Sequence, residues 1–485
     1  MKRLVVPESV ALRSSPVGAD ALTDTRPALR LERVSLAYGD VLALDEISID
    51  FPAGSATAIV GANGAGKSSL IAVAAGMNRP LSGTVTVEGH AVTRGNGSNG
   101  LLGVLTHRSM LYDGLTGREN LALHARLRGL PAWRVAAVIE ETRLDGVADR
   151  RVGGLSHGTR KRLSLARVLL HNPSVLLLDE PFSGLDAGAQ EELARMFVEV
   201  RGRKTLLFAT HEAERVRVLA DRVVRLEEGR VVSETAHVAA SRVEQVAPNG
   251  RAEAAVRIPG HSSGVLDTAA AVLRKDLTVE ARTRSMSSAV LVLAGLLATV
   301  LAMAFEPLAG SPRAVSGMLW VLIVFTALHA LARGFDEDFR DDALRGLLLS
   351  GADPMGMYLG RVASTAALLL GVALVAAVGL AVFFAAPTLL AVLPGLAVIM
   401  ALAAVGLAAV GSVLSVLSHH SRLGETFLPL LFLPLAVPVL LAGVEAVATL
   451  LESGELDVGW LRVLALYAVG MVAAGMMVFE FAAEE

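Results

Sequence analysis

The sequence predicts two domains of different fold class, an α/β domain in the first half of the chain and an all-α domain of six membrane-spanning helices in the second half. In the first half, short apolar strands alternate with glycine-containing turns and helix-compatible runs. In the second half, six apolar stretches come close to the ~20 residues that a spanning helix needs. A hydrophobic share of 53% over 485 residues is too high for a purely soluble protein.

Charge and composition exclude other classes of protein. The formal net charge is only −3, so no global basic field favours a nucleic acid as partner. The chain has no cysteine, which excludes disulfides and thiolate metal sites. Residues 1–28 lack the apolar core of a signal peptide and are predicted to form a polar, disordered extension.

The α/β domain is predicted to begin at residues 29–36, where apolar and polar residues alternate as in a half-buried strand. Tyr38 follows in a turn. An exposed tyrosine there would stack on an adenine ring, whereas a buried one would only pack the turn, and the residue alone favours neither. Further strands are predicted at residues 47–51, 56–60, 83–89 and 101–105.

The strongest motif is the glycine loop GANGAGKS at residues 61–68, between the strand at residues 56–60 and a helix-compatible run at residues 69–75. The backbone N–H groups of such a loop, together with the helix dipole, form a cradle for phosphate. Lys67 can reach the β- and γ-phosphates, and the Ser68 hydroxyl can ligate Mg²⁺. The predicted nucleotide-binding residues here are Gly61, Asn63, Gly64, Ala65, Gly66, Lys67, Ser68 and Ser69.

A helical lobe is predicted at residues 116–149, where apolar residues recur at three- and four-residue spacing. The turn GGLSHGT at residues 153–159 then precedes a helical run, so a second helix N-terminus could contact phosphate. Ser156 and Gly158 are the candidates, although many helices begin with serine or glycine for structural reasons alone.

Two carboxylates follow the apolar run at residues 175–178, which is typical of a buried central strand. Asp179 would hold the water shell of Mg²⁺, and Glu180 would act as general base on the attacking water. The last strand of the domain is expected at residues 205–209, where it presents His211 at its end. A histidine alone at such a place more often caps the next helix.

Together these motifs resemble the ATPase domain of ABC transporters, and the likeness covers residues 29–235. The resemblance implies ATP hydrolysis with ATP and Mg²⁺ as cofactors. It also implies a homodimer with composite ATP sites, because in this family the signature loop, here with Ser156 and Gly158, contacts ATP bound to the opposite subunit. The motifs, in chain order, are Tyr38, GANGAGKS, LSHGT, VLLLDE, SGLD and His211.

The resemblance also implies residue roles. Tyr38 would stack on adenine, Asp179 and Glu180 would be the Walker B pair, and His211 would sense the γ-phosphate. His107 departs from the family pattern, because it replaces a glutamine that helps to place Mg²⁺ and water and couples to the membrane part. An imidazole can make one such hydrogen bond in a pH-sensitive way, so His107 is a candidate catalytic residue and Mg²⁺ contact. The signature LSHGT replaces LSGGQ, and slow hydrolysis is expected.

A linker is predicted at residues 236–268, and a six-span domain at residues 269–485. Three prolines, Pro429, Pro434 and Pro438, should kink or interrupt the fifth span. Arginines and lysines cluster in alternate loops, so both termini and the ATPase domain are expected in the cytoplasm, with the spans in the inner membrane. The predicted spans are residues 286–305, 315–332, 363–384, 395–417, 427–447 and 460–481.

Two amphipathic helices are predicted outside the spans. Residues 335–348 have an acidic face and should dock on the ATPase domain near His107, with a membrane-surface helix as the alternative. Residues 273–284 are basic and suit a helix at the lipid interface.

The membrane half resembles CcmB, the six-span membrane component of the cytochrome c maturation (Ccm) haem exporter, and the first half resembles CcmA, its ATPase component. The stretches that carry the likeness include LRKDLTVEARTR, DDALRGLLLSGADPMGMYLGR, VFEFAAEE and THRSMLYDGLTGRENL. The resemblance implies a fused transporter half that drives haem export, or release of a haem-loaded chaperone, in cytochrome c biogenesis. Other maturation membrane proteins and a haem chaperone would be its partners.

The residues themselves identify no haem site. His329 could ligate iron, but a polar residue between helices is the more common interpretation. Glu445, the other ionisable group within a span, is expected to be solvated near the outer interface. The alternatives are an exporter of another cargo, such as a drug, lipid or polysaccharide, and an ATP-driven device that releases a chaperone without moving a solute.

Overall fold

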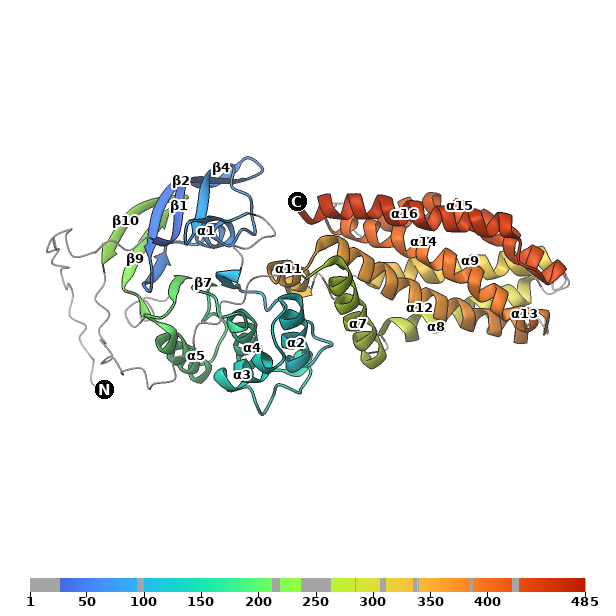
Figure 1. Cartoon of the computed structure of the whole chain (residues 1–485), viewed down its shortest axis with the longest axis horizontal. Helices are drawn as coiled ribbons and strands as arrows, with labels where there is room; N and C mark the ends of the chain where they lie inside the picture. The colour runs from blue at the N-terminus through green and yellow to red at the C-terminus, as the bar shows by residue number, and fades with distance from the viewer. Residues whose placement is uncertain are drawn as a thin grey trace, which may run out of the picture.

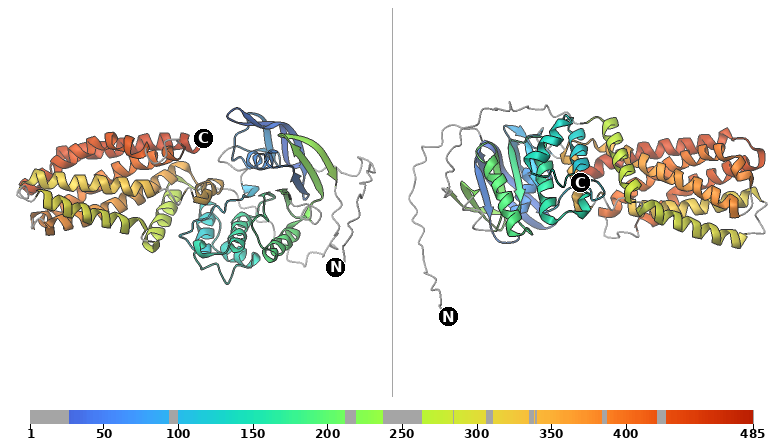
Figure 2. Two further views of the ribbon diagram at one scale, coloured as in Figure 1. Left: turned by 180° about the vertical axis from the view of Figure 1, so that it is seen from behind. Right: turned by 90° about the horizontal axis from the view of Figure 1, so that it is seen from below.

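The computed structural model describes residues 27–93, 100–211, 219–236, 263–283, 285–305, 311–334, 338, 340–383, 387–420 and 427–484. The predicted extension at residues 1–28 lies outside the described residues up to residue 26, and the predicted linker at residues 236–268 lies outside them at residues 237–262. Figure 1 shows an α/β domain beside a bundle of long helices, with α7 (Val265–Thr283) and α11 (Ala343–Leu349) between them, and Figure 2 shows the same arrangement from behind and from below.

The central sheet of the α/β domain has six strands in the order β10-β9-β3-β8-β7-β6. All its neighbouring pairs are parallel except β9 and β10. The carboxyl ends of β3, β8 and β7 therefore lie at one edge, where ligands of such sheets bind. The strands are β3 (Ala56–Val60), β6 (Leu102–Leu105), β7 (Val175–Asp179), β8 (Thr205–Ala209), β9 (Arg222–Glu227) and β10 (Arg230–Ala236).

A second, antiparallel sheet has the order β2-β1-β4-β5. The helix α1 (Lys67–Ala74) packs between the two sheets, and its buried Leu70 shares a core with Leu29 of β1 and Leu177 of β7. This core fixes the start of α1 against the central sheet. The strands are β1 (Pro27–Tyr38), β2 (Val41–Pro52), β4 (Ser82–Val87) and β5 (His90–Ala91).

The predicted helical lobe is confirmed as α2 (Gly117–Leu127) and α3 (Trp133–Glu141). A capping box formed by Thr116 and Glu119 begins α2, because each side chain bonds the backbone N–H of the other. The lobe continues into α4 (His157–Leu169) and is followed by α5 (Ala187–Val200), and these helices share one apolar core.

One strand prediction was wrong, since β8 is not the last strand of the domain. Two more strands follow, β9 and β10, which form a hairpin. Arg222 and Arg225 weaken the apolar signal of β9, yet the alternating Val224 and Leu226 are fully buried against β3.

The membrane half contains six helices long and apolar enough to span a membrane among the described residues, as predicted. The third begins at Pro354, earlier than the predicted residue 363. The short α13 (Pro387–Ala391) separates the third from the fourth. The six are α8 (Ser285–Phe305), α9 (Pro312–Gly334), α12 (Pro354–Phe383), α14 (Leu393–His420), α15 (Phe427–Ser453) and α16 (Val458–Glu484).

Two predictions for this half need correction. The fifth span is not interrupted, because α15 runs unbroken through Pro434 and Pro438, whereas the predicted kink stays a prediction. Pro429 lies in its first turn, where a missing N–H is tolerated. The described part of residues 335–348 is not one helix either, since Asp341 and Asp342 adopt left-handed backbone angles just before α11.

Candidate functional site

The glycine loop connects β3 to α1, as the sequence predicts. Gly64 and Gly66 have φ values of 82° and 100°, which glycine adopts without strain. A Cβ at Gly61 would collide with the carbonyl oxygen of Leu226 in β9, so the loop needs a glycine there as well. Lys67 Nζ donates to the carbonyl oxygens of Gly61 and Ala62 at 2.9 Å each and so curls over the loop.

The hydroxyl of Ser68, in the first turn of α1, donates to Asp179 Oδ1 at the end of β7, at 3.1 Å. Asp179 is only 5% exposed. Burial raises the pKa of this carboxyl, while the Ser68 hydrogen bond and nearby His107 oppose the rise. A hydroxyl and a buried carboxylate side by side are oxygen donors of the kind that Mg²⁺ prefers, so the residues fit this cation.

Glu180 directly follows β7 and has a φ of 48°, an unusual value for a non-glycine residue. Its Oε2 lies 2.9 Å from Nδ1 of His211, which follows β8. The parallel pairing of β7 and β8 thus brings together the two residues that the sequence predicts as base and γ-phosphate sensor. Left-handed backbone at a non-glycine residue is costly and is often found at functional sites, which supports Glu180 as a candidate.

Tyr38, at the end of β1, is 52% exposed, and its hydroxyl accepts a hydrogen bond from Asn78 Nδ2 at 2.6 Å. A ring that remains this exposed does not pack the domain core. Of the two interpretations left open by the sequence, the exposure favours stacking on a flat ligand such as adenine.

The signature residues lie at the exposed N-terminus of α4. Ser156 is the N-cap, and its hydroxyl accepts a hydrogen bond from the Thr159 backbone N–H. A Cβ at Gly158 would approach Ala189 of α5 at 3.0 Å, so glycine suits this close contact. Among the described residues, no hydrogen bond joins Ser156 or Gly158 to the glycine loop of the same chain.

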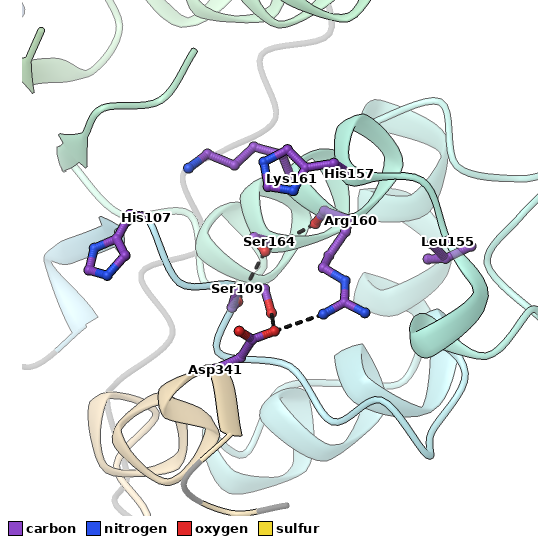
Figure 3. A pocket seen from close by; sticks show the side chains of 8 residues that line it. All are labelled: His107, Ser109, Leu155, His157, Arg160, Lys161, Ser164 and Asp341. Carbon is purple, nitrogen blue, oxygen red and sulfur yellow. Dashed lines mark hydrogen bonds and ion pairs between the residues drawn. The ribbon is translucent and has the colours of Figure 1, made fainter. Parts of the chain in front are cut away.

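His107 is exposed at the rim of a cavity of about 280 Å³. Lys161 of α4 donates to the carbonyl oxygen of Thr106 at 3.0 Å and so fixes the residue before His107. Burial lowers the pKa of Lys161 to about 8. Figure 3 shows the lining side chains, which are His107, Ser109, Leu155, His157, Arg160, Lys161, Ser164 and Asp341.

The membrane half docks beside this cavity, which confirms the predicted place near His107. Asp341 Oδ2 accepts from Ser109 Oγ at 3.0 Å and from Arg160 Nη1 at 2.7 Å. At the end of α11, Ser350 Oγ lies 2.8 Å from His124 Nδ1 of α2.

The basic helix α7 also contacts the ATPase half, because Arg282 bonds both carboxylate oxygens of Glu119 at 2.6 and 2.7 Å. Its Leu266 and Leu277 remain exposed, so the predicted lipid-interface role of this helix stays a prediction.

A buried charge cluster beneath α7 was not predicted. Lys275 Nζ contacts Asp338 at 2.6 Å and Asp276 at 2.8 Å, and Arg361 of α12 contacts Asp276 at 2.9 Å. The Lys275 ammonium lies 4.1 Å from the ring centroid of Tyr112, which comes from the ATPase half. Burial lowers the pKa of Lys275, but the two carboxylates outweigh it and the pKa is raised.

Comparison with known proteins identifies a matching family for each half of the chain. The model of the family described as ABC transporter matches residues 44–183, and that of the CcmB protein matches residues 267–485. The Nod factor export ATP-binding protein I of Rhizobium sp. (strain N33) is 36% identical over 217 residues, which are 43% of this chain and 71% of that protein. The chain belongs to the ABC transporter family. It joins an ABC ATP-binding domain to a CcmB-type membrane domain.

Other ABC relatives match less of their own length. The sulfate/thiosulfate import ATP-binding protein CysA 1 of Chromobacterium violaceum is 35% identical over 214 residues, 42% of this chain and 60% of that protein. The chain thus spans about three fifths of that relative. Among solved structures, cbiO1 of Clostridium perfringens, part of the ABC transporter complex cbiONQ, aligns with a TM-score of 0.40 and 28% identity over 44% of this chain and 89% of that chain.

Proposed function

We propose that two copies of this chain hydrolyse ATP at composite sites and use the energy in cytochrome c biogenesis, by exporting haem or by releasing a haem-loaded chaperone. The observation that carries the proposal is the Ser68–Asp179 and Glu180–His211 pairing at one sheet edge, on a chain whose membrane half matches the CcmB family.

Different residues serve different steps in the transfer of the γ-phosphoryl group to water. The glycine loop and Lys67 bind the β- and γ-phosphates. Mg²⁺, held by the Ser68 hydroxyl and through water by Asp179, would neutralise charge on the phosphates. Glu180 accepts the proton of the attacking water. His211 keeps Nδ1 on Glu180, so Nε2 is the ring nitrogen that can face the γ-phosphate.

The composite site follows from the separation of the two motifs. Figure 1 shows α4, which begins at the N-cap Ser156, in the lower part of the ATPase domain and α1 in its upper part. A second chain related by a two-fold axis would bring its α4 to this chain's α1 and complete two sites at once.

The location of the ATPase domain supports a cytoplasmic assignment for it. It docks at the end of the helix bundle that carries Lys275, Arg282 and Arg361, and basic residues favour the cytoplasmic side. An inner membrane location, lipid contacts of the spans and partner proteins of cytochrome c maturation belong to the same proposal.

A different cargo is the alternative function. The matched relatives are named for sulfate import and for Nod factor export, so related ATP-binding domains are found with different cargoes. Loss of the gene should abolish covalently bound haem in c-type cytochromes. Normal levels of these cytochromes in the deletion strain would contradict the maturation role and leave a drug, lipid or polysaccharide exporter.

A counterflow experiment distinguishes transport of haem from release of a chaperone. Vesicles that contain the purified chain should exchange internal for external haem in the presence of ATP if haem itself is the cargo. ATP-dependent chaperone release without haem exchange would assign the mechanical role.

A further inference from the structure

A single carboxylate from the membrane half holds two segments of the ATPase half. Oδ2 of Asp341 accepts from Ser109 Oγ at 3.0 Å and from Arg160 Nη1 at 2.7 Å, and Figure 3 shows both bonds meeting at this group. Arg160 also pairs with Asp113 at 2.8 Å. The side chains of Asp341 and Arg160 are 31% and 21% exposed, so this ion pair is better shielded from water than an ordinary surface pair.

These two segments serve different ATP molecules in the proposed dimer. Ser109 and His107 follow β6, whose Leu105 pairs with Leu178 of β7, so this segment begins beside Asp179 and Ser68 of the chain's own phosphate site. Arg160 lies in the first turn of α4, four residues after Ser156, which would contact ATP bound to the opposite subunit. Asp341 therefore connects one half of each composite site.

The backbone around Asp341 favours a fixed position for this carboxylate. Asp341 and Asp342 have φ values of 54° and 55°, and Met110 N–H donates to the Asp341 carbonyl oxygen at 2.9 Å. Left-handed non-glycine residues persist only where the surrounding structure holds them. The adjacent cavity of about 280 Å³ leaves room for Arg160 and His157 to change position without displacing packed atoms.

We propose that Asp341 is a positioning residue that makes the two ATP sites cooperative, an inference that rests on the proposed dimeric ATPase. Binding of ATP at one site moves the His107 segment, Ser109 moves with it, and Asp341 transmits the displacement to Arg160 and the signature end of α4. The second site is thereby set before its own ATP arrives.

The competing hypothesis is that the Ser109 and Arg160 segments are coupled by a direct link within the ATPase domain. Ser164 of α4 donates to the carbonyl oxygen of Ser109 at 3.0 Å and to that of Arg160 at 3.0 Å, without help from the membrane half. Asp341 and Ser164 can be separated experimentally because each acts through its own side chain.

The test measures the Hill coefficient for ATP in hydrolysis by the purified full-length dimer. The variant Asp341→Asn suits it, because asparagine tolerates the left-handed backbone while the charge is removed. We expect a Hill coefficient above 1 in the wild type and about 1 in Asp341→Asn. Arg160→Gln should also give about 1, and the double variant should show no further change. Ser109→Ala, which spares the ion pair, gives an independent measurement if Asp341→Asn folds poorly.

Two matched controls decide the outcome. Asp342→Asn alters the neighbouring left-handed aspartate, whose ion pair with Arg108 is longer at 3.5 Å, and should keep the wild-type coefficient. Ser164→Ala should keep it as well. The inference would be overturned if Asp341→Asn kept the wild-type Hill coefficient. It would also be overturned if cooperativity were lost in Ser164→Ala but not in Asp341→Asn, or if the wild type hydrolysed ATP without cooperativity. Absence of hydrolysis, or an active monomer, would instead contradict the proposed function.

Discussion

Asp179 and Glu180 are neighbours in the chain, but they occupy different environments. Asp179 is buried and bonded to Ser68, whereas Glu180 turns through a left-handed backbone angle toward His211 at the open edge of the sheet. We therefore propose that Asp179 holds a cation and that Glu180 faces the attacking water. The environment, more than the residue type, assigns the two roles.

Replacement of Glu180 by glutamine should leave ATP binding intact and lower turnover by two or more decades, on the order of what a positioned general base supplies. Phosphate release by the purified variant and binding of a fluorescent ATP analogue measure the two quantities. Glu227→Gln is the control, because Glu227 pairs with Arg225 on the exposed face of β9. Equal turnover in wild type and Glu180→Gln would exclude Glu180 as the base.

The buried Lys161 predicts a pH dependence of stability. Its folded pKa of about 8 lies below the ordinary value of 10.5, so the unfolded chain binds more protons between these two values. The contribution of Lys161 to the free energy of unfolding is therefore lowest below pH 8 and increases as the pH rises toward 10.5. Relative to Lys161→Met, the wild type should therefore gain up to about 3 kcal/mol between pH 7 and pH 10.5.

Thermal unfolding in detergent at several pH values measures this difference. A constant difference between wild type and Lys161→Met across the range would show that Lys161 does not titrate there.

At the scale of elements, the strands and helices with strong local signals were predictable. The strands β3 and β7 are apolar except for Thr57 and Asp179, and the glycine loop after β3 marks its end. The β9–β10 hairpin was missed because arginines interrupt its apolar pattern, and only tertiary burial reveals its place beside β3.

The same limit applies to the candidate site. Motifs fixed the glycine loop, Asp179, Glu180 and His211, since parallel strand ends meet at one edge. Asp341 appeared in the sequence only as one acid on a predicted helix face. Its contacts with Ser109 and Arg160 depend on the docking of two domains, which no local pattern encodes.

The charge cluster between α7 and α12 predicts a strong effect of one substitution. Lys275→Met leaves Asp276 and Asp338 with Arg361 alone, and an uncompensated buried charge costs about 3–5 kcal/mol. We expect lower abundance in the membrane and a lower thermal midpoint.

The control is Arg313→Gln, which breaks the exposed pair with Glu445 at 3.3 Å and should cost no more than about 1 kcal/mol. Similar losses in both variants would mean that the buried cluster has no special role in stability.

In the proposed dimer, each ATP site combines the glycine loop of one chain with the signature loop of the other. Co-expression of wild-type chains with an equal amount of Ser156→Arg chains should leave about a quarter of wild-type activity if both sites of a dimer are needed. Phosphate release by the mixed preparation measures it. Activity of about half, as simple dilution gives, would contradict a dimer that needs both sites for hydrolysis.

The docking of the two halves explains why one chain can carry both functions. Asp341 and Ser350 bring the membrane half to the edge where ATP would bind, and Arg282 ties α7 to the first turn of α2. We infer that changes at a bound nucleotide would reach the helices through these short paths of bonded side chains.

In the proposed function, ATP turnover by this chain drives cytochrome c biogenesis, and a complementation experiment measures this dependence. Covalently bound haem in c-type cytochromes is measured in cells that lack the gene and carry the wild type, Glu180→Gln or Glu227→Gln at matched membrane abundance. We predict that the wild type and Glu227→Gln restore the cytochromes and that Glu180→Gln does not. Full restoration by Glu180→Gln, or normal cytochromes in cells without any copy of the gene, would contradict the proposed role of ATP turnover in cytochrome c biogenesis.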